Sequence, residues 1–336
     1  MVSSSLLPWL HKALQAGLGL RSHALLIQGP AGVGQFDLAM QLAASWLCES
    51  SRGQGPACGL CASCKLLQSR THPDFQLLVP EALREGLGLA DEAGEGETKA
   101  SKTKPSREIK IDAVRATLAF AQATSARGQA KVVVIYPAEA LNTVAANALL
   151  KTLEEPSGLL RFVLASDEPQ ALLPTIRSRC QALSLALPAR EQAVSWLAGQ
   201  GVEQAEVLLR AAGGRPNLAQ GWAQDGLSAA AWLALPKRLA RGEVSAISDW
   251  PVPRAIDALQ RLNHDLLRLA HGAGPSYFPA EALPKVRQGA PLQAWGQALQ
   301  RAMRHAEHPL NAGLLLESLV GQGQSAIAEA VGTLRP

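Results

Sequence analysis

The chain has 336 residues, of which 47% are hydrophobic, so it can bury the cores of two or three globular domains. Its 32 basic and 28 acidic residues leave a net charge of +4, too small by itself to indicate nucleic-acid binding. No signal peptide and no uncharged apolar run of about 18 residues is evident, and the clustered cysteines fit a reducing compartment. These features predict a cytoplasmic protein with no membrane partner.

The first part of the chain predicts strands that alternate with helices. After a short helix over residues 6–18, apolar runs predict strands at 23–28, 74–79, 131–136, 161–166 and 181–185. Helices are expected in between, including 111–124 and 141–154. This alternation is typical of a doubly wound parallel sheet, so the fold class is α/β at this end.

A glycine-rich turn follows the first predicted strand. Gly29 and Gly34 have the spacing of a phosphate-binding loop, which carries Lys and then Ser or Thr after its last glycine. Those two positions hold Gln35 and Phe36, which supply neither a cation for the phosphates nor an oxygen for Mg²⁺. We interpret the turn as a degenerate phosphate loop in which no ATP is expected. A plain strand-to-helix connection is the alternative.

A second magnesium element is also missing. In ATPases with a phosphate loop, the strand corresponding to 131–136 ends in an acidic residue that organises Mg²⁺. Here the strand ends at Tyr136 and Pro137, and the first acid is Glu139. The two losses together predict that this chain does not hydrolyse ATP.

The cysteines of residues 48–64 have the spacing of a metal site. Three of them are separated by two residues each and a fourth lies upstream, namely Cys48, Cys58, Cys61 and Cys64. Four thiolates can close a tetrahedral shell around a structural Zn²⁺. An iron–sulfur cluster or free thiols are alternatives, although the Cys-Pro of the ferredoxin pattern is absent. We expect the nearby His72 to be a surface or capping residue and not a ligand.

Two further segments differ in composition from the predicted sheet. Residues 84–108 are rich in Gly, Glu, Lys and Ser, which predicts a mobile surface loop. From Pro188 onward the pattern is helical. Helices at 191–197, 205–212 and 217–222 predict a three-helix lid, and later amphipathic segments such as 255–269 predict an all-α domain.

Two motifs resemble bacterial clamp-loader AAA+ subunits. These are NALLKTLEEP at 147–156 and Ser178-Arg179-Cys180 before the last strand. With the cysteine cluster, the resemblance covers residues 1 to about 225 and extends weakly to the end. Intact phosphate loops mark the gamma/tau motor subunits of this family, whereas a Gln-Phe loop and a Tyr-Pro strand end resemble its delta-prime subunits, which are not motors.

The resemblance implies a domain plan and a set of partners. The plan is an AAA+ domain over 1–186 with a zinc module at 48–64, a three-helix lid over 187–228 and a helical collar over 229–336. The implied partners are a gamma/tau motor subunit and a delta subunit in a hetero-pentameric ring and, through that assembly, the sliding clamp and primed DNA. The chain itself would have no catalytic activity, although the holoenzyme is a DNA-directed DNA polymerase.

The resemblance also implies a role for Arg179. In clamp loaders the arginine of the Ser-Arg-Cys motif projects toward ATP bound by the neighbouring subunit, so Arg179 would be an arginine finger in trans. The alternative is that Arg179 merely caps the preceding helix. Lys151, Glu154 and Glu155 have the residue types of a catalytic group, and a solvated helix end before Pro156 is the equal alternative. Arg215 receives no role.

Two other functions stay open on the sequence alone. One is an ATP-binding clamp-loader motor with an aberrant phosphate loop, and the other is a zinc-dependent nucleic-acid-binding module. Magnesium-dependent ATP affinity would favour the first. Retention on single-stranded DNA at moderate salt would favour the second.

Overall fold

The computed structural model describes residues 6–89, 105–306 and 311–332. The chain divides into two compact units, Met1–Gln192 and Ala193–Pro336. In the described part of the chain, no helix has both the length and the apolar character needed to cross a membrane.

The first unit is built on a parallel sheet of five strands in the order β2-β3-β4-β1-β5. The strands are β1 (Ala24–Gln28), β2 (Phe75–Leu78), β3 (Lys131–Ile135), β4 (Leu160–Ser166) and β5 (Gln181–Ser184). All five residues of β3 are buried, as expected for an uninterrupted apolar strand that is covered on both faces. Strand β1 lies between β4 and β5. It does not pair with β2, the next strand in sequence. The predicted doubly wound parallel sheet is confirmed.

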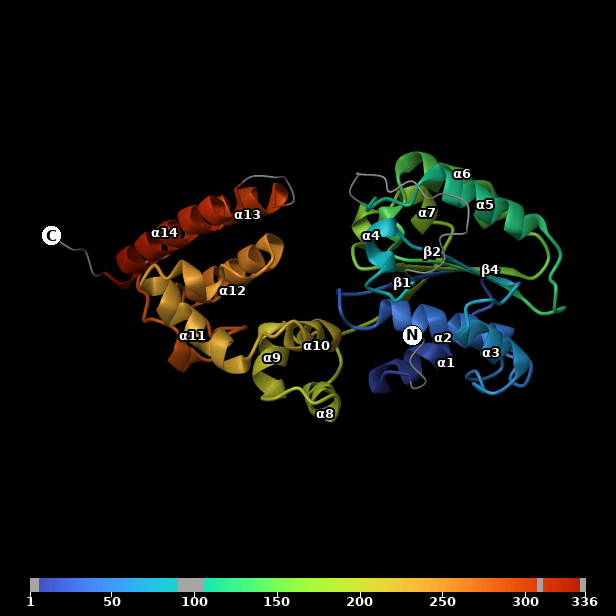
Figure 1. The fold of residues 1–336 in the computed structure, drawn as a ribbon, viewed down its shortest axis with the longest axis horizontal. Coiled ribbons are helices and arrows are strands. Elements are labelled where there is room, and N and C mark those ends of the chain that lie inside the picture. Colours follow the sequence, from blue (N-terminus) through green and yellow to red (C-terminus); the bar gives the residue numbers. More distant parts are fainter. Residues whose placement is uncertain (1–5, 90–104, 307–310, 333–336) are drawn as a thin grey trace. The chain divides into compact units, whose positions relative to one another are not determined.

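Helices cover both faces of this sheet (Figure 1). One face carries α1 (His11–Gly19), α2 (Gln35–Leu47) and α3 (Ala62–Gln68), and the other carries α5 (Ile111–Gln122), α6 (Thr143–Glu154) and α7 (Pro174–Arg177). Asn142 is the N-cap of α6, and its side-chain oxygen accepts a hydrogen bond of 2.9 Å from the Ala145 amide. The helix ends two residues before Pro156, because the residue preceding a proline disfavours helical geometry.

The predicted mobile loop at 84–108 is only partly described, because residues 90–104 lie outside the described part. Short helix α4 (Glu81–Arg84) leads to Leu89, which is buried, and Arg70 donates hydrogen bonds to the carbonyl oxygens of Leu87 and Gly88. Glu85, Gly86 and Gly88 are exposed, so the mobile surface loop over 84–108 stays a prediction.

The second unit is helical and has a continuous core. Its helices are α8 (Arg190–Gly199), which begins at the end of the first unit, α9 (Ala205–Ala211), α10 (Pro216–Gln224), α11 (Ala229–Ala240), α12 (Val252–Ala270), α13 (Ala290–Arg304) and α14 (Ala312–Val331). Trp232 stacks on Phe278 with ring centroids 4.5 Å apart and on Trp222 at 5.7 Å. One hydrophobic cluster thus joins helices on both sides of residue 228, and the division there into lid and collar stays a prediction.

Candidate functional site

The turn between β1 and α2 has the glycine spacing of a phosphate loop. Packing within the chain is sufficient to explain its two glycines. Gly34 has a φ of 100°, and a Cβ placed there would lie 2.7 Å from Leu7 Cδ1. A Cβ on Gly29 would lie 2.7 Å from the carbonyl oxygen of Leu185. Gly34 is therefore required by its left-handed backbone and Gly29 by the close approach of a backbone carbonyl, whether or not a nucleotide binds.

Gln35 stands in the place of the lysine and turns its amide back onto the loop. Its side-chain Nε2 donates hydrogen bonds of 2.8 Å to the carbonyl oxygen of Gly29 and 2.7 Å to that of Pro30. The side chain is only 2% exposed. Both amide protons are thus used within the loop, and the side chain acts as a clasp that stabilises the loop itself.

The two positions that would serve Mg²⁺ carry an aromatic pair. The rings of Phe36, from the first turn of α2, and Tyr136, from the end of β3, lie 5.1 Å apart at an interplanar angle of 39°. Burial raises the pKa of the Tyr136 phenol, and the carboxylates of Asp167, Glu139 and Asp37 raise it further. The phenol therefore stays neutral at physiological pH and cannot act as an anionic metal ligand.

The carboxylate of Glu139, the first acid after β3, accepts hydrogen bonds from backbone amides. The residue lies in the short 3-10 helix Ala138–Ala140, and its Oε1 accepts hydrogen bonds of 3.1 Å from the Asp167 amide and 3.2 Å from the Glu168 amide. The carboxylate thus ties together the chain segments that follow β3 and β4. Its position after the strand is explained by this link without a metal.

Arg179 lies just after α7 and is held by the chain itself. Its Nε donates to Glu154 Oε1 at 2.6 Å, its Nη2 contacts the same oxygen, and its Nη1 donates to the Thr175 carbonyl oxygen at 2.9 Å. The side chain stays 30% exposed. The bond to Thr175 is the helix-capping contact considered from the sequence. Glu154 is exposed at the end of α6, as the solvated reading expects, and it also pairs with Arg179.

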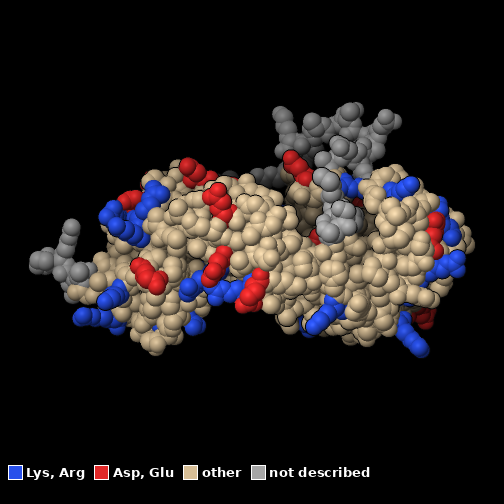
Figure 2. Space-filling view, turned by 90° about the horizontal axis from the view of Figure 1, so that it is seen from below, with Lys and Arg blue, Asp and Glu red and all other residues tan. Residues whose placement is uncertain are grey.

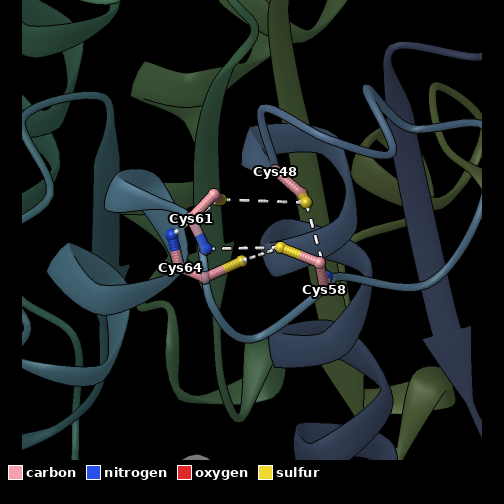
Figure 3. A group of neighbouring side chains, drawn as sticks. All are labelled: Cys48, Cys58, Cys61 and Cys64. Atoms are coloured by element: carbon pink, nitrogen blue, oxygen red, sulfur yellow. Dashed lines mark hydrogen bonds between the residues drawn. The ribbon is translucent and has the colours of Figure 1, made fainter.

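The four cysteines meet at one point, as their spacing predicts (Figure 3). Cys48 follows the end of α2, and the other three lie on the turn into α3 and in its first residues. All four Sγ atoms lie within 4.8 Å of one another, with Cys48–Cys61 at 3.9 Å and Cys58–Cys64 at 4.0 Å. A tetrahedral Zn²⁺ site with Zn–S bonds of about 2.3 Å has sulfur–sulfur edges of about 3.8 Å. The group therefore fits such an ion.

Backbone amides are aimed at the sulfurs. The amides of Ser51 and Cys58 each lie 3.4 Å from Cys48 Sγ, and that of Cys61 lies 3.3 Å from Cys58 Sγ. Although burial raises the pKa of Cys48, hydrogen bonds from Ser51 and nearby amides outweigh it and lower this pKa to about 6. Burial and the neighbouring Cys61 and Cys48 raise the pKa of Cys64. A divalent cation would relieve the repulsion among such thiolates.

A network of hydrogen bonds and an ion pair links the cysteine group to the loop before β3, and no sequence pattern indicates it. Arg127 donates through Nε to Ser63 Oγ at 3.1 Å and forms an ion pair with Glu49. Glu49 and Ser63 are each adjacent in sequence to a cysteine of the group. The loop that carries Arg127 is in turn held by the buried Asp74, which accepts the Ala126 amide at 2.8 Å and the Arg127 amide at 3.0 Å.

His72 is not a member of the cysteine group. Its Nδ1 accepts a hydrogen bond of 3.1 Å from the Asp74 amide, which is a local capping contact. Of the two expected roles, surface or capping, the capping role is therefore the one observed. The residue is buried, and burial lowers its pKa. It is therefore neutral near pH 7.

The charged side chains do not gather into a single basic surface on the face drawn in Figure 2. Lys and Arg are interspersed there with Asp, Glu and uncharged residues. This distribution agrees with the small net charge of the sequence and offers no continuous electrostatic track for a phosphate backbone on that face.

The chain is similar to known proteins of one family. Residues 4–189 match a family model described as DNA polymerase III, delta subunit. DNA polymerase III subunit delta' of Escherichia coli is 35% identical over 283 residues, which cover 79% of this chain and 77% of that protein. The Pseudomonas aeruginosa subunit delta' is 40% identical over 220 residues, 63% of this chain, and the match spans 60% of the relative's length.

A solved structure matches the fold along most of the chain. It is a DNA polymerase III, gamma subunit-related protein of Thermotoga maritima, with a TM-score of 0.50, 16% identity, and coverage of 95% of this chain and 99% of that one. The sheet with its flanking helices and the helical second unit thus share the fold of that protein. On the family model and the sequence identities, the chain belongs to the family of DNA polymerase III delta-prime subunits.

Proposed function

We propose that this chain is a non-hydrolysing subunit of the bacterial DNA polymerase III clamp loader. It assembles with a gamma/tau motor subunit and a delta subunit in a hetero-pentameric ring in the cytoplasm. Through that ring it helps to load the sliding clamp onto primed DNA. The observation that carries the proposal is that side chains of this chain itself fill the catalytic positions of its phosphate loop.

The filled loop argues against an ATP site in this chain. A bound triphosphate carries several negative charges, which a working loop balances with lysine and Mg²⁺. Here both protons of the Gln35 amide are committed to loop carbonyls, and the rings of Phe36 and Tyr136 pack against each other. Binding ATP in the usual way would break these contacts and would gain no cation in return.

Arg179 is the residue through which the chain would act on a neighbour. It is a permanently charged, partly exposed guanidinium at the end of α7. In a motor subunit's ATP site it would stabilise the charge that develops on the γ-phosphate, an effect worth roughly 10³ to 10⁵ in rate for arginine fingers. The metal of the Cys48–Cys64 group would be structural Zn²⁺, since four thiolates leave no open position for water.

Two measurements test the function. Labelled ATP is titrated into the isolated chain with Mg²⁺ and again with a magnesium chelator, and we expect no micromolar affinity in either case. Micromolar affinity that chelation abolishes would instead make the chain an ATP-binding motor.

The second measurement is the ATPase rate of a loader reconstituted with Arg179→Ala. We expect a lower rate with assembly intact, as judged by gel filtration. Arg115→Ala, on the exposed face of α5, is a matched control with a similar surface ion pair. An unchanged rate with Arg179→Ala would refute the donation in trans.

A further inference from the structure

The guanidinium of Arg179 is held by Glu154 along one edge and by Thr175 at Nη1. Nε and Nη2, which share an edge of the planar group, both contact Oε1 of Glu154, with the Nε distance at 2.6 Å. Nη1 donates to the Thr175 carbonyl oxygen at 2.9 Å. An arginine has five N–H donors, so one donor on Nη1 and one on Nη2 stay uncommitted by these contacts. Two terminal donors are what bidentate recognition of a phosphate needs.

Glu154 comes from a different element than Arg179. It is the last residue of α6, 25 residues earlier in the chain, whereas Arg179 follows α7. Its side chain is 48% exposed and that of Arg179 is 30% exposed. An ion pair at such a surface adds little to stability, because solvent screens it and two flexible side chains must be ordered. Its more informative effect is on where the guanidinium points.

We propose that Glu154 is a positioning residue for Arg179. It fixes the Nε edge of the guanidinium and thereby presents the terminal edge to a phosphoryl group bound by a neighbouring subunit. This inference rests on the proposed donation of Arg179 in trans. A finger that is oriented before it meets its target loses less side-chain entropy on engagement, so the carboxylate raises the rate of the neighbour's reaction.

The same contact could instead have the opposite effect on the neighbour's rate, and experiment can distinguish the two. The negative charge of Glu154 weakens the field of Arg179 at a phosphate, so the carboxylate could retain the finger away from its target. Removing Glu154 would then raise the neighbour's rate. The orienting role predicts a loss, and the retaining role predicts a gain.

The contact itself is tested on the isolated chain by NMR. A hydrogen-bonded Arg Nε–H exchanges slowly with water, and the Arg179 signal is identified as the one that disappears in Arg179→Lys. We expect Glu154→Ala to weaken or abolish this signal. Glu155→Ala, a change at the adjacent and equally exposed glutamate, should leave it unchanged. A signal that persists in Glu154→Ala would overturn the inference.

The consequence is tested by ATPase kinetics of the reconstituted loader. The decrease in kcat caused by Arg179→Ala is the reference. We expect Glu154→Ala to cause most of the same decrease, with KM for ATP unchanged. Glu154→Gln, which keeps an acceptor oxygen, should restore part of kcat, and Glu155→Ala should cause no decrease. The double variant Glu154→Ala/Arg179→Ala should be no slower than Arg179→Ala alone.

The outcomes separate the two proposals. If Arg179→Ala lowers the rate and Glu154→Ala leaves it unchanged or raises it, the positioning role is wrong and the donation in trans stands. If Arg179→Ala leaves the rate unchanged, both fall together.

Discussion

Phe36 and Tyr136 form a ring contact of 5.1 Å between the first turn of α2 and the end of β3. These are the two places from which an ATPase with a phosphate loop brings a hydroxyl and a carboxylate to its magnesium ion. In this chain the same two places meet as an apolar contact, so the distance between α2 and β3 is maintained by packing. The predictions below test that contact and the other interactions that hold the candidate site.

The aromatic pair should be measurable as a coupling energy. Phe36→Ala should lower the free energy of unfolding by about 2 kcal/mol, because a partly buried ring and its partner contact are lost. A double-mutant cycle with Tyr136→Ala should give a coupling of about 1 kcal/mol. Urea denaturation measures both. Leu159→Ala, at an exposed position, is the control and should have little effect. Strictly additive effects at positions 36 and 136 would contradict the pairing.

The clasp formed by Gln35 depends on donors and not on size. Gln35→Glu keeps the shape but replaces Nε2, with both its N–H donors, by a carboxylate oxygen that faces the carbonyl oxygens of Gly29 and Pro30. We expect a loss of about 2 to 4 kcal/mol in the free energy of unfolding, from two hydrogen bonds and a buried polar conflict. Gln35→Met, which removes the donors without adding an acceptor, should cost less. A neutral Gln35→Glu would show that the loop does not need the clasp.

Metal content should depend on the four cysteines and not on the fifth. Cys61→Ser should release the metal and lower the melting temperature, because three thiolates bind Zn²⁺ less well and the module loses its cross-link. Cys180 lies outside the group, so Cys180→Ser should keep the metal. Elemental analysis of the purified protein and of both variants measures this. We expect one zinc per chain, and iron in that analysis would overturn the assignment.

His72 should make stability fall in mild acid. Burial lowers its pKa in the folded chain, so below the ordinary histidine pKa of about 6.5 the unfolded chain binds more protons than the folded one. Stability is then retained above this pH and is lost as the pH falls through it. His72→Asn, which keeps a capping acceptor, should flatten this dependence. Urea midpoints at pH 7.5 and 5.5 in the same zinc buffer give the comparison, and parallel curves for the two proteins would exclude His72 as the cause.

Local sequence patterns were sufficient to predict the helices and strands and the grouping of the four cysteines. The strand at 131–136 is an uninterrupted β-branched run, and Cys58, Cys61 and Cys64 lie within one turn, so short-range spacing carries the information. The burial of His72 was missed because a single histidine next to a turn has no periodicity to indicate which side faces the core.

Contacts between distant segments could not be predicted in the same way. Arg179 meets Glu154 across 25 residues, the Arg127 amide meets Asp74 across 53, and Arg127 meets Glu49 across 78. Each is a side chain from a loop or helix end whose direction is set by how the elements pack. Charge and composition at these positions are equally consistent with solvent exposure alone, so the partner of Glu154 could not be identified from the sequence.

The steric demand at Gly29 and Gly34 has a consequence for how such loops are read in other genomes. A substitution meets the Leu185 carbonyl at position 29 and a left-handed backbone at position 34 before any ligand is considered, so packing alone would keep both glycines in a loop that did not hydrolyse ATP. Glycine spacing on its own therefore cannot separate working ATPases from their inert paralogues. The diagnostic residues are those at positions 35, 36 and 136, because packing and phosphate binding require different side chains there.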